Sequence, residues 1–295
     1  MNLERAKLIL IIAFAGLNLF LAYHLFWPDF GRLTRIAVSD EEVNQLESLL
    51  NENNYFLETS LDRSMRTGAF ITVSTSLNYQ RSLLLRLLRE GAQFSHSDQA
   101  NFYRKDEITA IIHPTGLIRI VYTPPQQIVE DSTTADRREL RNQVEQYLRN
   151  EQFMPDGAVF DYLEQNDKGD LIFHYYQVLE EAPVFAGHFK VTLAGDRLKS
   201  MDIYWLTPLE REPAREMEVI TAPEALTNFI HDVGPSREPQ QITAVKLGYF
   251  SGEYDAEKWE IPPVWRIVLQ NGKIYYINAF TGNLEQESVI PDQLP

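Results

Sequence analysis

The longest uninterrupted apolar run of the chain lies near its N-terminus. Residues 8–27 read LILIIAFAGLNLFLAYHLFW and contain no formally charged side chain. Twenty residues in a helix that rises about 1.5 Å per residue span about 30 Å, the thickness of the hydrocarbon core of a bilayer. The pattern therefore predicts a single transmembrane helix at 8–27, preceded by a tail at 1–7 and followed by a juxtamembrane stem at 28–38.

Charged and aromatic side chains at the two ends of this run indicate its orientation. Arg5 and Lys7 precede it, so the positive-inside rule places the N-terminus in the cytoplasm. Tyr23 and Trp27 at the other end are typical of an aromatic belt. A cleaved signal peptide would have a shorter apolar region, of about 7–15 residues, followed by small residues at the cleavage site. We therefore expect a retained anchor, with the rest of the chain outside the cell.

Small and polar side chains share one face of the predicted membrane helix. Ile11, Ala15, Asn18 and Ala22 recur at spacings of four, three and four residues. The two alanines allow another helix to approach closely, and Asn18 gains a hydrogen bond if it faces a partner instead of lipid. We expect this face to contact a membrane partner. The alternative is that these residues need no partner, because alanine is common in membrane helices and so apolar a span tolerates one asparagine.

Beyond the stem, the hydrophobic pattern switches between helical and strand periods. Capping boxes from Ser39 to Glu42 and from Thr221 to Glu224 predict two helix starts. Two more helices are expected at 80–89 and 135–149, and short apolar runs between turn residues predict antiparallel strands. These strands are expected at 68–74, 102–105, 108–113, 117–122, 160–164, 171–179, 189–193, 198–206, 244–250, 264–269 and 273–278.

The order of these elements predicts an α+β fold, in which helices are followed by antiparallel sheets, instead of alternating βαβ units. The polar, turn-rich stretch around 123–134 is interpreted as a boundary. It separates a first extracellular domain at 39–125 from a second one at 135–295. Within the second domain a helix followed by strands occurs twice, at about 135–207 and 221–295.

Composition restricts the chemistry that the chain can perform. Its 295 residues include 42 acidic and 27 basic ones, and a net charge of −15 disfavours binding to nucleic acid. There is no cysteine, which excludes disulfides, thiolate metal sites and a cysteine nucleophile. The six histidines never recur at metal-ligand spacing, and no hydrolase or nucleotide-binding motif is present. We therefore expect a protein that is not an enzyme, with no catalytic residues, no metal and no cofactor.

Several segments nevertheless carry residue types that occur in active sites. Residues 95–98 read SHSD, but sequence neighbours do not converge into a triad, so we interpret them as a polar loop. Residues 166–170 resemble a calcium loop, lack its bidentate glutamate and fit a hairpin turn. Asp255 and Glu257 form a carboxylate pair that we interpret as solvated, and His174 is expected to be a half-buried sheet residue.

Both ends of the chain resemble the YycI family. Residues 4–23 read ERAKLILIIAFAGLNLFLAY, which is similar to the start of that family, where Ala and Lys precede an apolar span with Asn-Leu-Phe-Leu. Residues 263–282 read PVWRIVLQNGKIYYINAFTG, which is similar to its end and, more distantly, to the closing hairpin of PepSY-type modules. The middle of the chain offers no specific motif.

This resemblance implies a non-enzymatic regulator in the plasma membrane of a Gram-positive bacterium. It implies a complex with the sister protein YycH and contact with the WalK (YycG) sensor histidine kinase through membrane helices. Through this kinase the protein would influence the WalR regulator and cell-wall metabolism. The extracellular domains are then expected to be PepSY-like, YycH-like repeats. The resemblance leaves open the sign of regulation and whether the chain forms a homodimer.

Two other functions stay open at this point. An anchored, extracellular cell-wall-remodelling enzyme would show a cleft with converging carboxylates of unequal pKa. A PepSY-like peptide-binding or inhibitory module would show an exposed apolar groove or a free strand edge.

Overall fold

The computed structural model describes residues 14, 17, 18, 38–88, 91–129, 137–209 and 216–285. Within this part of the chain four helices accompany a larger number of strands, which confirms the α+β class. None of the helices described there is long and apolar enough to cross a membrane. The span predicted at 8–27 lies outside the described residues except for Phe14, Leu17 and Asn18.

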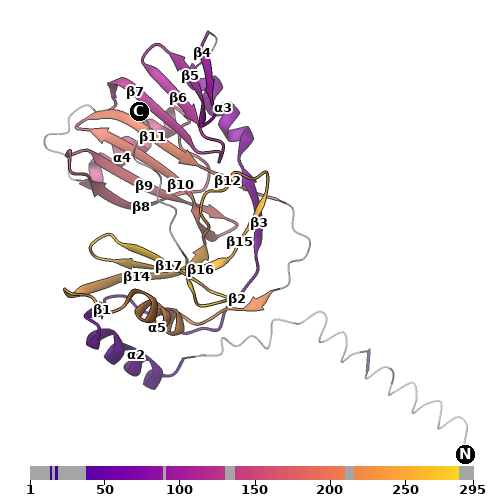
Figure 1. The fold of residues 1–295 in the computed structure, drawn as a ribbon, viewed down its shortest axis with the longest axis vertical. Coiled ribbons are helices and arrows are strands. Elements are labelled where there is room, and N and C mark those ends of the chain that lie inside the picture. Colours follow the sequence, from indigo (N-terminus) through magenta and orange to yellow (C-terminus); the bar gives the residue numbers. More distant parts are fainter. Residues whose placement is uncertain are drawn as a thin grey trace, which may run out of the picture.

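The larger of two lobes is an antiparallel sheet with two helices on one face (Figure 1). Leu83 of α3 and Val144 of α4 are fully buried against the apolar side of this sheet. We call residues 77–204 the large lobe. Its elements are α3 (Leu77–Leu88), β4 (Gln93–Ser97), β5 (Ala100–Lys105), β6 (Ile108–Ile112), β7 (Ile118–Gln127), α4 (Arg137–Asn150), β8 (Ala158–Gln165), β9 (Leu171–Leu179), β10 (Ala182–Ala194) and β11 (Arg197–Tyr204).

The small lobe packs two capped helices on a second antiparallel sheet (Figure 1). Both predicted capping boxes are present. The side chains of Ser39 and Thr221 each accept a hydrogen bond from the backbone amide of the glutamate three residues later, and the carboxylate of that glutamate accepts one from the backbone amide of the cap residue. Leu50 of α2 and Phe229 of α5 are fully buried in its core. Its elements are α2 (Asp40–Glu52), β1 (Tyr55–Leu57), α5 (Ala222–Val233), β14 (Gln240–Tyr249), β16 (Pro263–Leu269), β17 (Ile274–Asn278) and β18 (Leu284–Glu285).

Two connections join the lobes. Strands β10 and β14 run parallel and pair at Val184 and Tyr249, which makes the two sheets continuous. The chain also leaves the small lobe and returns to it through segments that pair with each other, β2 with β13 and β3 with β12. We call these two pairs the connecting ribbon; β15 (Trp259–Ile261) adds a third strand to it beside β3. Its other strands are β2 (Thr67–Gly68), β3 (Ile71–Thr75), β12 (Leu206–Pro208) and β13 (Met217–Glu218).

Most of the expected elements are present, with differences where pairing overrides local pattern. The prediction that residues 95–98 form a loop is wrong, because 95–97 belong to β4, an exposed edge strand whose register with β5 runs from Gln93 to Ser97. Strand β10 begins at Ala182, seven residues before the expected start, because β9 pairs with its first half as well. The hairpin turn predicted at 166–170 is confirmed, since Asn166 accepts from the amides of Lys168 and Asp170.

The hydrophobic clusters do not follow the predicted division between 39–125 and 135–295. One cluster joins residues of α3, β6 and β7 to residues of α4 and β9–β11, and another joins α2 and β1 to α5, β16 and β17. Strand β7 also extends to Gln127 and pairs there with Arg197, inside the polar stretch interpreted as a boundary. The division into those two domains therefore stays a prediction, and the description below uses the two lobes.

Candidate functional site

The residues predicted to contact a membrane partner lie almost entirely outside the described part of the chain. Asn18 is helical and exposed, as are Phe14 and Leu17. Their roles stay predictions, and the structure brings none of them together into a site. The other predicted contact and anchor residues fall outside the described residues: Arg5, Lys7, Ile11, Ala15, Ala22, Tyr23 and Trp27.

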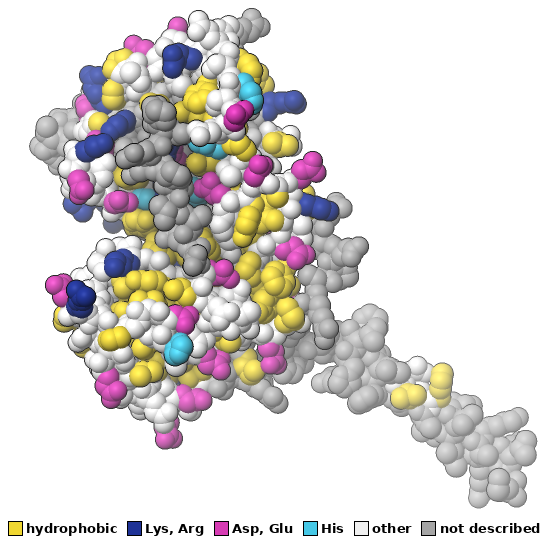
Figure 2. All heavy atoms as spheres, viewed as in Figure 1, with side chains coloured by type: hydrophobic (Ala, Val, Ile, Leu, Met, Phe, Trp, Pro, Cys, Tyr) yellow, Lys and Arg dark blue, Asp and Glu magenta, His cyan; other side chains and the backbone are white. Residues whose placement is uncertain are grey.

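A cleft of about 790 Å³ lies between the two lobes. Its floor is the face of the large-lobe sheet opposite the one on which α3 and α4 pack. Its wall comes from β16, β17 and the loop after β14, together with Phe185 from the first half of β10. Acidic side chains occur on both lobes, whereas Lys and Arg side chains gather mainly on the large one (Figure 2). The cleft thus lies where the more basic lobe faces the more acidic one.

The floor of the cleft is polar because the strands that form it alternate. Successive side chains of a strand point to opposite faces of its sheet. In β10, Val191 and Leu193 are fully buried against the helices, whereas His188, Lys190 and Thr192 line the cleft. The same strand therefore supplies both the hydrophobic core of the large lobe and the polar surface beneath the cleft.

Five side chains form a row across this floor, one from each of five neighbouring strands. Arg119 of β7 lies opposite Asp202 of β11, which lies opposite Lys190 of β10. Lys190 in turn lies opposite His174 of β9, which lies opposite Tyr162 of β8. Neighbouring strands are about 4.8 Å apart, so the row is about 19 Å long. Lys190 occupies its centre.

Two of the cations in the cleft are held by carboxylates of the large lobe. Arg119 donates from Nε to Asp202 Oδ1 at 2.7 Å and from Nη2 to Asp202 Oδ2 at 3.1 Å. Lys199 Nζ donates to Asp170 Oδ2 at 2.7 Å. This bond is the main reason why the pKa of Asp170 lies below its usual value. Both carboxylates are therefore neutralised within the floor.

A third ion pair crosses from one lobe to the other. Arg266 of β16 is 3% exposed and donates from Nη2 to Asp161 Oδ2 of β8. Its guanidinium carbon also lies 4.9 Å from the ring centroid of Phe185. Burial raises the pKa of Asp161, and the charge of Arg266 acts in the opposite direction. The pair is a buried electrostatic contact between the two lobes.

Two histidines of the floor are uncharged at neutral pH. Burial, with the positive charge of Lys190 as the next cause, lowers the pKa of His174 to about 3 and that of His188 to about 3. The His174 ring stacks on Tyr162 with centroids 4.2 Å apart, and its Nε2 lies 2.9 Å from Glu164 Oε2. A neutral ring bonded to a carboxylate must donate, so Nε2 of His174 carries the hydrogen. His174 is a sheet residue as predicted, and it is buried.

A buried carboxyl faces His188 from the loop after β14. Glu253 Oε1 lies 3.9 Å from His188 Nε2, and Thr115 Oγ1 donates to Glu253 Oε2 at 3.3 Å. Burial raises the pKa of Glu253. Within the described residues, Glu253 Oε1, His188 Nε2 and Arg266 Nε are buried without a hydrogen-bond partner. Such atoms are uncommon in folded proteins, so three of them in one cleft mark it as the candidate site.

Aromatic rings complete the wall. Phe250 and Tyr276 stack face to face with centroids 3.8 Å apart, and Phe185 lies 6.0 Å from Tyr276. The described part of the chain has no group of three or more His, Asp and Glu side chains placed to hold a metal ion. The arrangement as a whole suits the non-covalent binding of a ligand with both a polar and a flat apolar part.

The sequence of residues 34–280 matches the YycI family, described as YycI protein. This match covers most of the chain. The chain belongs to the YycI family. The match begins after residues 4–23, so the similarity of the N-terminal segment is not part of it, whereas the similarity of the C-terminal segment up to Phe280 is. A search of curated proteins finds no match.

Two solved structures are similar to this YycI-family chain. An uncharacterized protein from Eubacterium rectale ATCC 33656 superposes with a TM-score of 0.52 at 10% identity, over 85% of this chain and 99% of that one. YycH from Bacillus subtilis superposes with a TM-score of 0.46 at 19% identity, over 73% of this chain and 53% of that one. The first likeness concerns the fold alone.

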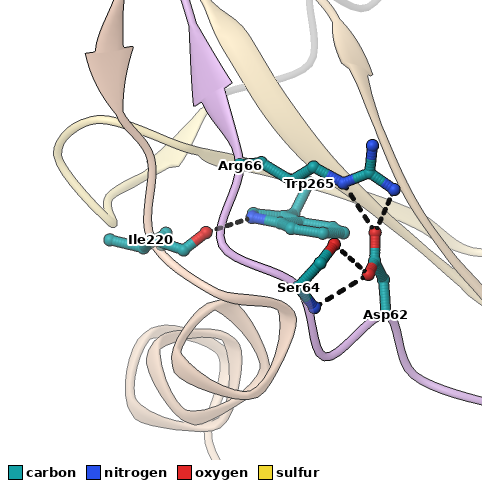
Figure 3. Close-up of polar contacts among 5 residues, drawn as sticks. All are labelled: Asp62, Ser64, Arg66, Ile220 and Trp265. Carbon is teal, nitrogen blue, oxygen red and sulfur yellow. Dashed lines mark hydrogen bonds and ion pairs between the residues drawn. The ribbon is translucent and has the colours of Figure 1, made fainter. Parts of the chain in front are cut away.

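The family's C-terminal segment contributes to both the core and the cleft. Neighbouring residues of β16 point to opposite faces, so Trp265 is buried beneath α5 while Arg266 lines the cleft. Trp265 Nε1 donates to the carbonyl oxygen of Ile220 at 2.8 Å (Figure 3). Beside the indole ring, Asp62 accepts from both Ser64 and Arg66, which fixes the start of the connecting ribbon (Figure 3).

Part of this cleft could be predicted from the sequence pattern. The alternation of polar His188, Lys190 and Thr192 with apolar neighbours in β10 is a signal that the strand has one polar face. Glu253 lies in a loop and carries no such signal, and the pairing of Arg266 with Asp161 joins positions 105 residues apart. Asp255 and Glu257, which follow Glu253 in the same loop, are exposed, as predicted.

Proposed function

We propose that this YycI-family chain is a non-enzymatic, membrane-anchored regulator of a WalK-type sensor histidine kinase. It acts in a complex with a YycH-like sister protein in the plasma membrane of a Gram-positive bacterium and thereby influences cell-wall metabolism. The observation that carries the proposal is the family match over residues 34–280. The resemblance of residues 4–23 to the start of the same family supports the membrane anchor.

The proposed regulation passes through the predicted membrane helix. Coupling requires that the helix contacts two kinase states differently, because equal contact with both would shift nothing. A difference of about 1.4 kcal/mol changes the ratio of the two states by about tenfold. One interhelical hydrogen bond from Asn18 is of this order, at about 0.5–2 kcal/mol.

The absence of cysteine makes the helix contact directly testable. In the full chain, Asn18→Cys places one thiol on the proposed contact face, and Phe20→Cys places one on the opposite face as a matched control. Paired with a series of single cysteines along the kinase helices in intact membranes, Asn18→Cys is expected to form a disulfide and Phe20→Cys is not. Equal cross-linking from both positions, or none from Asn18→Cys, would contradict contact through this face.

Kinase output supplies the second part of the test. Replacing residues 8–27 by an unrelated apolar helix is expected to abolish the regulatory effect while the protein stays in the membrane. Autophosphorylation of the kinase, measured in membranes with and without the chain, reports the effect. Full regulatory output from the replaced helix would refute the proposal that the helix carries the signal.

The cleft also bears on the enzyme alternative, because its carboxyl groups have unequal pKa values. Burial raises the pKa of Glu253, whereas the bond from Lys199 lowers that of Asp170. A hydrolase of the two-carboxylate type needs one protonated and one ionised group, both free to reach the bond that is cleaved. Asp170 is held in an ion pair with Lys199. We therefore favour a regulator, and release of wall fragments by the purified chain that Glu253→Gln abolishes would reverse this preference.

A peptide-binding module is the other alternative. A groove of about 400 Å³ between α2 and α5 is lined by Leu46, Leu49 and Pro223, together with the capping glutamates Glu42 and Glu224. The edge strand β4 is fully exposed along its length. These features fit the expectations for such a module, but nothing in the described part of the chain indicates what would cover either surface, so the regulator remains our proposal.

A further inference from the structure

Lys190 stands apart from the other cations of the cleft. Arg119, Lys199 and Arg266 each form an ion pair with a carboxylate. Lys190 lies at the centre of the five-residue row and is half-buried, and it has neither an ion pair nor a hydrogen bond within the described residues. The floor of the cleft therefore has a positive charge that is not held in an ion pair, although this charge acts on the carboxyl of Glu253 and opposes the rise of its pKa that burial causes.

The groups around Lys190 are mainly neutral hydrogen-bond donors. His188 and Thr192 flank it on β10, and Ser200 lies opposite Thr192 on β11. The carboxylate directly opposite Lys190 on β11, that of Asp202, accepts hydrogen bonds from Nε and Nη2 of Arg119. A single cation surrounded by neutral donors stabilises one negative charge, since bonds from such donors to an anion are stronger than bonds between neutral groups.

The size and the wall of the cleft indicate what the anion is attached to. A volume of about 790 Å³ is far larger than an inorganic ion and falls within the range of sites for small organic molecules. The stacked rings of Phe250 and Tyr276, with Phe185 beside them, offer flat apolar surface on the wall. The unpartnered Nε of the buried Arg266 supplies one more donor on the same side.

We propose that the cleft is a binding site for an organic carboxylate. Its carboxylate pairs with Lys190 and accepts hydrogen bonds from the neutral donors beside it, while its apolar or aromatic part lies against the wall of Phe250, Tyr276 and Phe185. A carboxylate fits better than a phosphate because one unpaired cation matches one negative charge. Phosphate groups are typically held by arginine clusters or by helix N-termini.

Binding is tested on the purified full chain in non-ionic detergent with three small probes. N-acetylphenylalanine carries the carboxylate, its amide lacks the charge, and phenyl phosphate carries the alternative anion. The ring signals of the histidines in NMR spectra report the position, because His174 and His188 line the cleft while His96 and His231 are exposed elsewhere. The expected result is that the acid shifts the signals of His174 and His188 only, and binds about tenfold more tightly than the amide.

Matched variants link the effect to Lys190. Lys190→Met, which keeps the apolar stem, is expected to weaken binding of the acid about tenfold, and Lys190→Arg is expected to retain it. Lys273→Met removes an exposed lysine of the β16–β17 turn and is expected to change nothing. The comparison of acid with amide uses the unaltered chain, so it remains decisive if Lys190→Met fails to fold.

Three results would overturn the proposal. Equal binding of the acid and the amide would show that charge is not recognised, and tighter binding of phenyl phosphate would assign the site to phosphate. Failure of the acid to shift either cleft histidine at about 20 mM would exclude the site. None of these results depends on the kinase, so the proposed regulatory function stands or falls separately.

Discussion

The buried ion pair between Arg266 and Asp161 permits a quantitative test of how the lobes are held together. Its two residues come from different lobes, and the Arg266 side chain is 3% exposed while that of Asp161 is 19% exposed. In Asp161→Asn the guanidinium loses its counter-charge but cannot lose its proton, because arginine stays protonated in proteins. The variant therefore leaves a buried positive charge without a negative counter-charge.

The size of this effect follows from two opposing contributions. Breaking a buried ion pair from one side costs about 3–5 kcal/mol. The ring of Phe185, 4.9 Å from the guanidinium carbon, remains in place and offsets about 0.5–2 kcal/mol of this loss. The free energy of unfolding should therefore fall by about 3 kcal/mol, which for a protein of this size lowers Tm by roughly 6–12 °C.

The reverse substitution should be milder and should depend on pH. In Arg266→Met the remaining Asp161 can take up a proton, and burial already raises its pKa. A carboxyl whose pKa is higher in the folded than in the unfolded state contributes stability at low pH. This contribution is lost as the pH rises from the unfolded pKa through the folded one. Arg266→Met should therefore be closer to the unaltered chain at pH 5 than at pH 8.

Thermal unfolding of the full chain, followed by near-ultraviolet circular dichroism, measures these differences. Arg149→Met is the matched control, because Arg149 pairs with Glu145 at 3.3 Å but its side chain is 63% exposed. Such a surface pair contributes less than about 1 kcal/mol. If Asp161→Asn lowers Tm no more than Arg149→Met does, the ion pair is not a buried contact that holds the lobes together.

The remaining predictions concern three other contacts. Lys199 lowers the pKa of Asp170, so this contact stabilises the fold at pH values above the unfolded-state pKa, and the stabilisation is lost as the pH falls through the folded-state pKa. Lys199→Met should therefore lower Tm at pH 7 but hardly at pH 2. An equal change of Tm at both pH values would contradict this assignment. Trp265→Phe removes the donor to Ile220 and part of a buried ring, so it should cost about 2 kcal/mol in urea unfolding; a loss below about 0.5 kcal/mol would show that this bond is dispensable. Asn18→Leu should weaken co-purification with a membrane partner without releasing the chain from membranes, and unchanged co-purification would refute the role of Asn18.

Local signals in the sequence predicted the elements whose causes are local. The capping boxes at Ser39 and Thr221 are complete within four residues each, and both helices begin where they predict. The turn at 166–170 is likewise closed by its own Asn166 side chain. These features could be read from the chain because the atoms that stabilise them are neighbours in sequence.

The lobes and the cleft depend on contacts that no local window contains. Strand β1 is only three residues long and exists because Tyr55 pairs with Gln240 of β14. The cleft brings Glu253 against His188 and Arg266 against Asp161, and each pair comes from elements that are distant in sequence. The sequence pattern indicated a polar face on β10, but only the tertiary arrangement shows what lies opposite that face.

The paired strands between the lobes determine which lobe a force on the N-terminal side of the chain reaches first. Among the described residues from 38 onward, the first and last elements, α2 and β18, belong to the same lobe, and the large lobe is an insertion whose departing and returning segments run side by side. A pull transmitted from residue 38 thus reaches the lobe that carries α2 before it reaches the inserted one. The inserted lobe is tied to the first one not only by the ribbon but also by the pairing of β10 with β14 and of Arg266 with Asp161, so such a pull can widen the cleft only by straining these contacts.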